Sequence, residues 1–227
     1  MLELNTIYNE DCLETMKRMP DNYVDLVLTD PPYNIAKDNN FQTMGRAGID
    51  FGEWDKDADI LSFIEPAYRV TRDGGSMVVF NGWKNLGDIA KEAERAGWQT
   101  KDMLRLKKSN PMPRNRDRRY ITDYECAIWF VKPKEKWTFN RQNPNYQRPE
   151  FVYPIESGLH PTQKNLDLMK ELIKIHSENG ETVYDPFMGS GTTARACKDL
   201  GRNYIGSEIS KEYCDIAEQR LGQGVLL

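Results

Sequence analysis

The chain has 227 residues, of which 39% are hydrophobic and 29% are charged, and its formal net charge is −4. This length and composition are typical of one globular domain with a full core, and the apolar runs are too short to span a membrane. The four cysteines are scattered and there are only two histidines, so we expect neither a disulfide framework nor a bound metal. From the length we expect a single domain over residues 1–227. The amino terminus has no signal-peptide pattern, so we expect the protein in the cytoplasm.

Hydrophobic periodicity predicts strands that alternate with helices along most of the chain. The predicted strands cover residues 7–12, 24–29, 77–80, 98–106, 124–131, 182–185 and 204–206, with a further short one at 137–139. The predicted helices cover residues 13–19, 59–70, 86–96, 166–176, 192–200 and 211–221. Gly74-Gly75 and Gly97 are expected to end the second and third helices. Residues 34–57 and 140–157 are expected to be loops, the first of them a lid or substrate-contacting loop.

This alternation predicts an α/β fold with a doubly wound, mostly parallel, Rossmann-like sheet. Approximately residues 101–160 contain no predicted helix, so we interpret them as an inserted region of strands and loops within the same domain. The stretch from Lys101 to Arg119 holds eight basic residues against Asp102 and Asp117. One basic stretch on an acidic chain is typical of a nucleic-acid surface, although a solvated charged loop would have the same composition.

The tetrapeptide Asp30-Pro31-Pro32-Tyr33 directly follows the predicted strand 24–29. Proline gives no ladder donor, so the strand ends there, and Asp30 lies at a carboxyl end, where open α/β sheets bind ligands. The rigid prolines would aim Asp30, Tyr33 and the Asp30 and Pro31 carbonyls at a cleft. Such a set can hold a flat ring that bears an amino group. The alternative is a strand-ending turn with a packed tyrosine.

A glycine-rich stretch, residues 189–194, follows the strand 182–185 and begins a helix. It matches the G-x-G-x-x-G/A fingerprint, whose glycines permit a tight turn and close backbone approach. Glu208 ends the next strand, 17 residues after Gly191, and can accept hydrogen bonds from ribose hydroxyls. The pattern predicts an adenosine-bearing cofactor, either a nicotinamide dinucleotide or S-adenosylmethionine. The alternative is a glycine turn that serves packing alone.

The segment His160-Pro161-Thr162-Gln163-Lys164 precedes the predicted helix 166–176. Thr162 can cap this helix, and Lys164 is expected in its first turn. Because a lysine there opposes the helix dipole, we predict that Lys164 binds a carboxylate. The methionine carboxylate of S-adenosylmethionine would serve, whereas a dinucleotide offers none. An ordinary helix start is the alternative.

Taken together, these residues resemble the permuted β class of amino-group DNA methyltransferases, most of all the adenine-N6 enzymes of the MboII restriction–modification kind. The matching pieces follow the order of that family: Asp11-Cys12, Asp30 to Tyr33, Asn110 to Asn115, Arg118 to Tyr120, His160 to Lys164, Asp185 to Thr192, and Glu208. The resemblance implies S-adenosylmethionine as cofactor and double-stranded DNA as partner. It leaves open a homodimer and a cognate restriction endonuclease. The proline that usually follows the lysine is Asn165 here, from which we expect only a softer helix start.

The resemblance also implies a role for each matching position. The catalytic residues would be Asp30, Pro31, Pro32 and Tyr33, with Asp30 bonded to the target amino group and Tyr33 stacked on the flipped base. The cofactor would be bound by Asp11, Cys12, Asp30, His160, Thr162, Lys164, Asp185, Pro186, Phe187, Gly189, Ser190, Gly191, Thr192 and Glu208. DNA would be contacted by Lys107, Lys108, Asn110, Arg114, Arg116, Arg118 and Arg119.

We therefore predict site-specific methyl transfer from S-adenosylmethionine to the N6 amino group of a flipped-out adenine in DNA. Cytosine-N4 transfer is the alternative, because it uses the same chemistry. The cytosine enzymes often have serine at the first tetrapeptide position, so Asp30 favours adenine. A nicotinamide-dependent oxidoreductase and a non-catalytic DNA-binding module are more remote alternatives. The oxidoreductase leaves the tetrapeptide and Lys164 unexplained.

Overall fold

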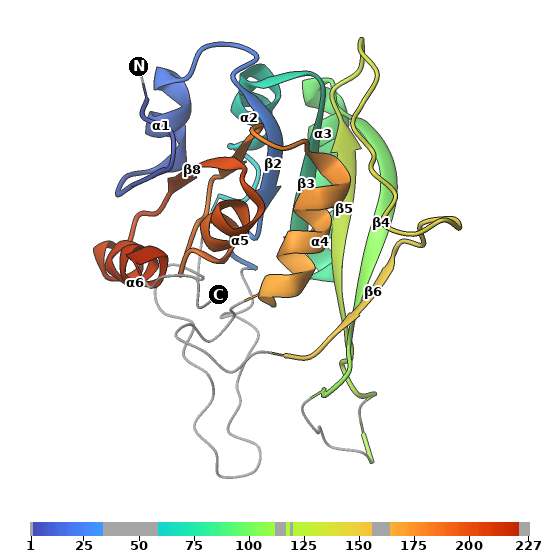
Figure 1. The fold of residues 1–227 in the computed structure, drawn as a ribbon. Coiled ribbons are helices and arrows are strands. Elements are labelled where there is room, and N and C mark those ends of the chain that lie inside the picture. Colours follow the sequence, from blue (N-terminus) through green and yellow to red (C-terminus); the bar gives the residue numbers. More distant parts are fainter. Residues whose placement is uncertain (1, 34–58, 112–116, 119, 156–163, 223–227) are drawn as a thin grey trace.

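The structure, a computed structural model, describes residues 2–33, 59–111, 117–118, 120–155 and 164–222 (Figure 1). The predicted lid loop at residues 34–57 therefore lies outside the described residues. One eight-stranded sheet with the order β1-β8-β7-β2-β3-β5-β4-β6 forms the centre of the described chain. The strands are β1 (Thr6–Tyr8), β2 (Val24–Thr29), β3 (Thr71–Asn81), β4 (Gln99–Lys108), β5 (Tyr124–Val131), β6 (Glu150–Tyr153), β7 (Thr182–Asp185) and β8 (Asn203–Ser207).

Helices cover both faces of this sheet, as Figure 1 shows. One apolar cluster joins the sheet to α1 (Cys12–Arg18), α2 (Ile64–Val70) and α3 (Trp83–Ala96). A second cluster joins the other face to α4 (Leu166–His176), α5 (Thr192–Leu200) and α6 (Lys211–Gly222). The central strands are buried on both faces, which explains their nearly continuous apolar sequences. No helix that the structure describes is both long and apolar enough to cross a bilayer.

All strands of the sheet except β5 run in the same direction. Strands β1, β8, β7, β2 and β3 are parallel neighbours, β5 is antiparallel to both β3 and β4, and β6 is parallel to β4. The predicted doubly wound, mostly parallel fold is therefore confirmed. The strands of the predicted insertion, β4 to β6, extend the same sheet.

The second predicted helix is shorter than expected and does not end at the glycine pair. It begins at Ile64, because Asp59 Oδ1 accepts hydrogen bonds from the backbone of Leu61 and Ser62 and so forms a turn. Gly74 and Gly75 lie inside the long strand β3, where the register with β2 shifts. A Cβ on Gly75 would lie 2.8 Å from the Asp25 carbonyl oxygen, so this close approach requires glycine.

Two predictions for the region before α4 were wrong. Residues 150–153 were expected in a loop but form β6, where Phe151 is buried while Val152 is exposed. This edge strand is too short for its alternation to stand out, and Pro149 and Pro154 flank it. Residues 137–139 form no strand, and instead the Phe139 ring stacks on Trp129 with ring centroids 5.2 Å apart.

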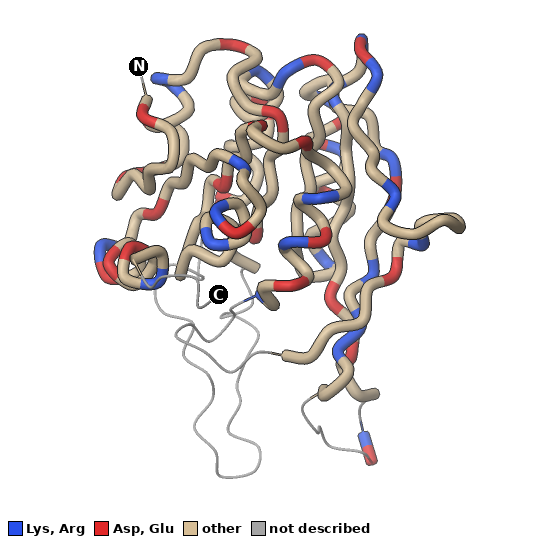
Figure 2. The backbone as a smooth tube through the Cα atoms, in the orientation of Figure 1, with Lys and Arg blue, Asp and Glu red and all other residues tan. Residues whose placement is uncertain are grey.

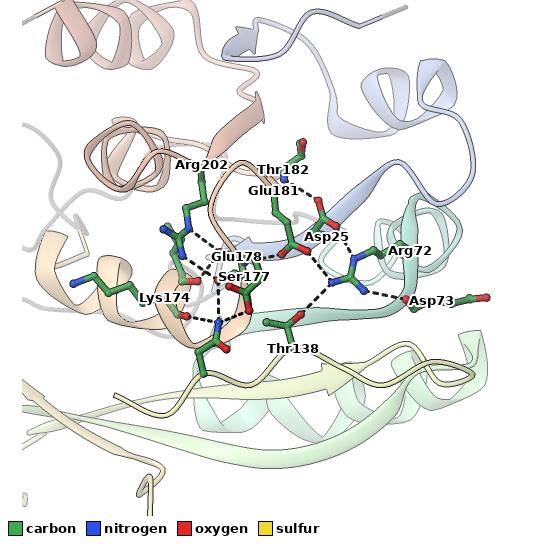
Figure 3. Close-up of polar contacts among 12 residues, drawn as sticks. Asp25, Arg72, Asp73, Thr138, Lys174, Ser177, Glu178, Glu181, Thr182 and Arg202 are labelled. Atoms are coloured by element: carbon green, nitrogen blue, oxygen red, sulfur yellow. Dashed lines mark hydrogen bonds and ion pairs between the residues drawn. The ribbon is translucent and has the colours of Figure 1, made fainter. Parts of the chain in front are cut away.

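A charged network ties together the amino-terminal ends of β2, β3 and β7 (Figure 3). Arg72 donates to Asp25 Oδ1 at 2.6 Å, to Glu181 Oε1 at 3.1 Å and to Thr138 Oγ1 at 3.1 Å. The other oxygen of Asp25 accepts from the backbone nitrogen of Thr182 at 2.8 Å. These bonds explain why an aspartate occurs within an otherwise apolar buried strand.

Candidate active site

The two sequence motifs lie side by side at one edge of the sheet. Strands β2 and β7 are parallel neighbours, with Leu26 paired to Val183 and Val27 to Tyr184. After β7 the chain continues to β8, and after β2 it continues to β3, on the opposite side. The strand order therefore reverses between β2 and β7, and this is the topological switch point, where open α/β sheets bind ligands. The turn at Asp30 and the glycine loop thus follow neighbouring strands at the same edge of the sheet.

Among the residues that the structure describes, Asp30 has one oxygen with a partner and one without. Its Oδ2 lies 2.6 Å from Lys164 Nζ. Its Oδ1 is buried and has no hydrogen-bond partner among the residues that the structure describes. Burial raises the pKa of Asp30, and the Lys164 ammonium opposes this shift. A buried, unpaired acceptor is costly to leave unsatisfied and is therefore suited to a ligand that donates a hydrogen bond.

The backbone of the tetrapeptide is held by two asparagines that the sequence analysis missed. Asn81 Nδ2 donates to the Pro31 and Pro32 carbonyls at 3.4 and 3.2 Å, and Asn85 Nδ2 donates to the Tyr33 carbonyl at 2.9 Å. The Pro31 carbonyl, predicted to face a cleft, is thus shared with a protein donor and has one further lone pair to offer. The missed signal is that Asn81 ends a buried strand next to β2.

Lys164 lies at the centre of the site and before α4, which corrects its predicted place in the first turn. Asn165 is the N-cap of that helix, since its side chain accepts from the backbone nitrogen of Leu168 at 3.0 Å. The prediction that Thr162 is the cap was therefore wrong, because asparagine one residue before the helix is itself a strong cap. Thr162 and His160 lie outside the described residues.

The Lys164 ammonium contacts three oxygens of the described residues. They are Asp30 Oδ2 at 2.6 Å, Glu125 Oε2 at 3.2 Å and Tyr33 OH at 3.3 Å. Two of these oxygens belong to carboxylates of the protein, and the predicted contact of Lys164 with the carboxylate of the cofactor stays a prediction. Glu125 was missed by the sequence analysis. The signal for it is a lone glutamate in a strand that otherwise reads as apolar and buried.

The glycine loop is held by Asp185, whose two oxygens are both engaged. Asp185 Oδ2 accepts from Thr193 Oγ1 at 2.6 Å, and its Oδ1 accepts from the backbone nitrogen of Phe187 at 3.1 Å. Burial raises the pKa of Asp185 to about 7. Asp185 therefore shapes the loop from within. Pro186 is buried beside it, and the Phe187 ring packs edge-on against Phe63.

The two glycines of the loop serve different purposes. Both have left-handed backbones, with φ of +53° at Gly189 and +79° at Gly191. A Cβ on Gly191 would lie 2.8 Å from Ala217 Cβ, so this glycine lets α6 approach. A Cβ on Gly189 would meet nothing within 4 Å among the described atoms, so Gly189 borders open space. From α6, Arg220 donates to Thr192 Oγ1 at 2.8 Å and to the Ser190 carbonyl at 3.5 Å.

Glu208 and Asp11 lie at the same edge, after β8 and β1. Glu208 Oε2 accepts from the backbone nitrogen of Gly189 at 2.8 Å, which fixes the carboxylate beside the open space, and burial raises the pKa of Glu208. Asp11 caps α1 by accepting from Leu13 at 2.7 Å, and the Cys12 carbonyl accepts from Tyr184 OH at 3.3 Å. The strand ends thus bring Asp11, Cys12 and Glu208 towards the glycine loop.

The predicted DNA-contacting residues fall into three groups. Figure 2 shows basic residues along β4, where Lys107 is exposed; Arg118 is also exposed. Lys108 pairs with Glu125 at 2.7 Å, and Asn110 exchanges hydrogen bonds with the backbone of Ile155. These two side chains therefore have structural partners. The remaining three, Arg114, Arg116 and Arg119, lie outside the described residues.

Comparison with known proteins identifies the family. The model of the N6/N4 DNA methylase family matches residues 24–219. The type II methyltransferase M.HinfI of Haemophilus influenzae is 32% identical over 247 aligned positions, which cover 96% of this chain and 68% of that protein. The type II methyltransferase M2.MboI of Moraxella bovis is 28% identical over 235 positions, which cover 94% of this chain and 86% of that protein.

Solved structures agree with this result. The M1.HpyAVI–SAM complex superposes with a TM-score of 0.78 at 39% identity, covering 95% of this chain and 98% of the other. The PvuII DNA methyltransferase (cytosine-N4-specific) shares the fold with a TM-score of 0.78 at 18% identity, covering 98% and 88%. Since the family model matches most of the sequence, the chain belongs to the N6/N4 family of DNA methylases.

Proposed function

We propose that this DNA methyltransferase modifies the N6 amino group of adenine in double-stranded DNA. Members of its family transfer a methyl group to amino nitrogens of DNA bases, and S-adenosylmethionine is their methyl donor. The choice of adenine rests on Asp30 itself, because the cytosine-N4 enzymes often have serine at this position. The observation that carries the choice of an amino group is Asp30 Oδ1, which is buried beside the switch point and has no hydrogen-bond partner among the described residues. An exocyclic amino group supplies the hydrogen-bond donor that this oxygen lacks.

The residues of the glycine loop fit the cofactor. The open space beside Gly189 leaves room for a ligand against the backbone, while Glu208 is held at its edge to accept from ribose hydroxyls. When bound, S-adenosylmethionine supplies the electrophilic methyl group. Asp11 and Cys12 would face its adenine. His160 and Thr162, which precede Lys164, stay predicted ligands of its carboxylate.

Asp30 prepares the amino nitrogen for attack. In a nucleobase the amino lone pair is delocalised into the ring, so the nitrogen is a weak nucleophile. A hydrogen bond to Asp30 Oδ1, with a second to the Pro31 carbonyl, would favour a tetrahedral nitrogen whose lone pair is free for in-line attack. Catalysis would thus consist of positioning and electrostatics, without a covalent enzyme intermediate. Tyr33 would stack on the base after it leaves the duplex.

Lys164 serves, in this proposal, as the counter-ion of Asp30. It holds Oδ2 at 2.6 Å and so leaves Oδ1 for the base. Burial disfavours the charged form of the Asp30 carboxyl group and so raises its pKa. The Lys164 ammonium opposes this shift and favours the carboxylate. A protonated Asp30 would present a hydrogen instead of a lone pair, and the amino group would lose its acceptor.

Approximately residues 101–160 would form the DNA-recognition region. The exposed basic residues Lys107 and Arg118 would contact phosphates or guanine edges, together with the arginines at 114, 116 and 119. Lys108 and Asn110 would shape this surface through the partners they already have. A second copy of the chain and a cognate endonuclease stay predicted partners.

The test is methylation of DNA by the purified protein with S-adenosylmethionine, followed by nucleoside digestion and mass spectrometry. We expect N6-methyladenine; N4-methylcytosine would establish the alternative specificity and overturn the adenine assignment. Asp30→Ala should abolish transfer while calorimetry still detects cofactor binding. Asp199→Ala is the matched control, because Asp199 is also a poorly exposed carboxylate paired with a lysine, Lys170, at 2.7 Å. A normal rate for Asp30→Ala would refute the catalytic assignment.

A further inference from the structure

Four side chains of alternating charge join the catalytic tetrapeptide to strand β4. Asp30 Oδ2 lies 2.6 Å from Lys164 Nζ, Glu125 Oε2 lies 3.2 Å from the same nitrogen, and Glu125 Oε1 lies 2.7 Å from Lys108 Nζ. Lys164 is only 10% exposed, and Glu125 is 28% exposed. Two positive and two negative charges thus form a neutral chain, which is the arrangement in which poorly hydrated charges are stable.

The direction of β5 brings Glu125 to this place. Because β5 is antiparallel to its neighbours, its first residues lie at the edge where the parallel strands end. Cys126 pairs with Asn81 at the end of β3, and Glu125 pairs with Leu106 near the end of β4. A glutamate at the start of β5 therefore lies at the same edge of the sheet as the tetrapeptide, although no motif marks it.

The three oxygens around Lys164 account for all the hydrogens of its ammonium. A lysine has three donors and no acceptor. In this site the acceptors are Asp30 Oδ2, Glu125 Oε2 and Tyr33 OH. With its donors shared in this way, the ammonium stays on one oxygen of Asp30 and does not bridge to Oδ1, which has no partner among the described residues.

We propose that Glu125 is a positioning residue for methyl transfer, which fixes the Lys164 ammonium on Asp30 Oδ2 and thereby leaves Oδ1 open to the target amino group. This inference rests on the proposed function. Without Glu125, Lys164 would lose one of the two anionic partners that it has among the described residues, and its ammonium would be free to move onto Oδ1. Lys108 would lose its contact with Glu125 as well. The ammonium also lowers the pKa of Glu125 to about 2, so Glu125 is an anion at neutral pH.

The experiment compares Glu125→Gln with wild type in single-turnover methylation at saturating DNA and cofactor. We expect the rate constant to fall about tenfold to hundredfold, the range of one hydrogen bond to a charged group. The dissociation constant for S-adenosylmethionine should change little, because Glu125 does not contact the cofactor in this proposal. Saturating DNA keeps any change in DNA affinity caused by the released Lys108 out of the rate constant. Glu125→Asp keeps the carboxylate and should restore part of the rate.

Two comparisons separate positioning from a structural role. Glu181→Gln is the matched control, since Glu181 is 21% exposed and pairs with Arg72 at 3.1 Å at the opposite end of the sheet. It should lower the unfolding temperature without slowing methyl transfer. In a Lys164→Met background, Glu125→Gln should slow the reaction much less than in wild type, because Glu125 acts through Lys164.

Several results would overturn the inference. A wild-type rate for Glu125→Gln would do so. An equal fall in rate on adding Glu125→Gln to the wild type and to Lys164→Met would do so too. If Glu125→Gln fails to fold, as judged by thermal unfolding and cofactor binding, Glu125→Asp carries the test. A rate below that of Glu181→Gln with unchanged cofactor affinity would support the proposal, whereas an equal fall in rate and in cofactor affinity would refute it. Absence of transfer by the wild type would instead refute the proposed function, on which this inference depends.

Discussion

The glycine loop allows a prediction in which one of two nearby substitutions mainly lowers stability and the other mainly lowers cofactor affinity. Gly189→Ala and Gly191→Ala each place a Cβ on a left-handed residue, which costs about 1–2 kcal/mol of folding free energy. At Gly191 the new Cβ would also lie 2.8 Å from Ala217 Cβ and 3.1 Å from Ala217 Cα. Overpacking of this kind costs about 1–3 kcal/mol more. A Cβ added at Gly189 would meet no described atom within 4 Å, so only the cost of the left-handed backbone applies there.

Gly191→Ala should therefore lose about 2–5 kcal/mol of unfolding free energy, and Gly189→Ala about 1–2 kcal/mol. Cofactor affinity should follow the reverse order. The Gly189 methyl group would occupy the space that we assign to S-adenosylmethionine, so its dissociation constant should rise at least about tenfold, which corresponds to about 1.4 kcal/mol. For Gly191→Ala we expect a smaller rise in this dissociation constant, measured under conditions in which the variant is folded.

Urea unfolding gives the stability of each variant, and calorimetric titration with S-adenosylmethionine below the unfolding transition gives its affinity. Each substitution serves as the control for the other, because both add the same methyl group to the same loop. Wild-type affinity in Gly189→Ala would refute the placement of the cofactor over this glycine. Equal stabilities of the two variants would refute the packing argument for Gly191.

Two further predictions concern stability away from the site. Burial lowers the pKa of His176 to about 3 from its ordinary 6.5, so the unfolded chain binds a proton that the folded chain refuses, and stability should be lost as pH falls from about 6.5 towards 3. His176→Phe keeps a ring against Trp129 and should flatten this loss in urea unfolding at several pH values; an unchanged pH dependence would contradict the assignment. Arg72→Leu should cost about 2–3 kcal/mol, less than the about 3–5 kcal/mol of a fully buried pair, because its partner Asp25 is 19% exposed. The rate of methyl transfer at low temperature should stay normal in this variant, and a large loss of rate would show that the network reaches the site.

The local features of the site were predictable from the sequence because each depends on a short stretch of chain. Two prolines end β2 directly after Asp30, and a glycine pattern between a strand and a helix predicts the turn before α5. The same local reasoning failed where structure depends on distant partners. The edge strand β6 forms only through pairing with β4, and Gly75 lies in β3 because of its contact with Asp25.

The tertiary structure decided which charges meet. Lys164 lies 131 residues from Tyr33 in sequence, yet its ammonium contacts that hydroxyl, Asp30 and Glu125 together. Glu125 reaches them because β5 alone runs against the sheet, and strand direction is set by pairing across the whole domain. The sequence by itself thus determined the motifs and the order of the elements. Their assembly at one edge of the sheet, and the contacts of Lys164 with Asp30, Glu125 and Tyr33, followed from long-range packing.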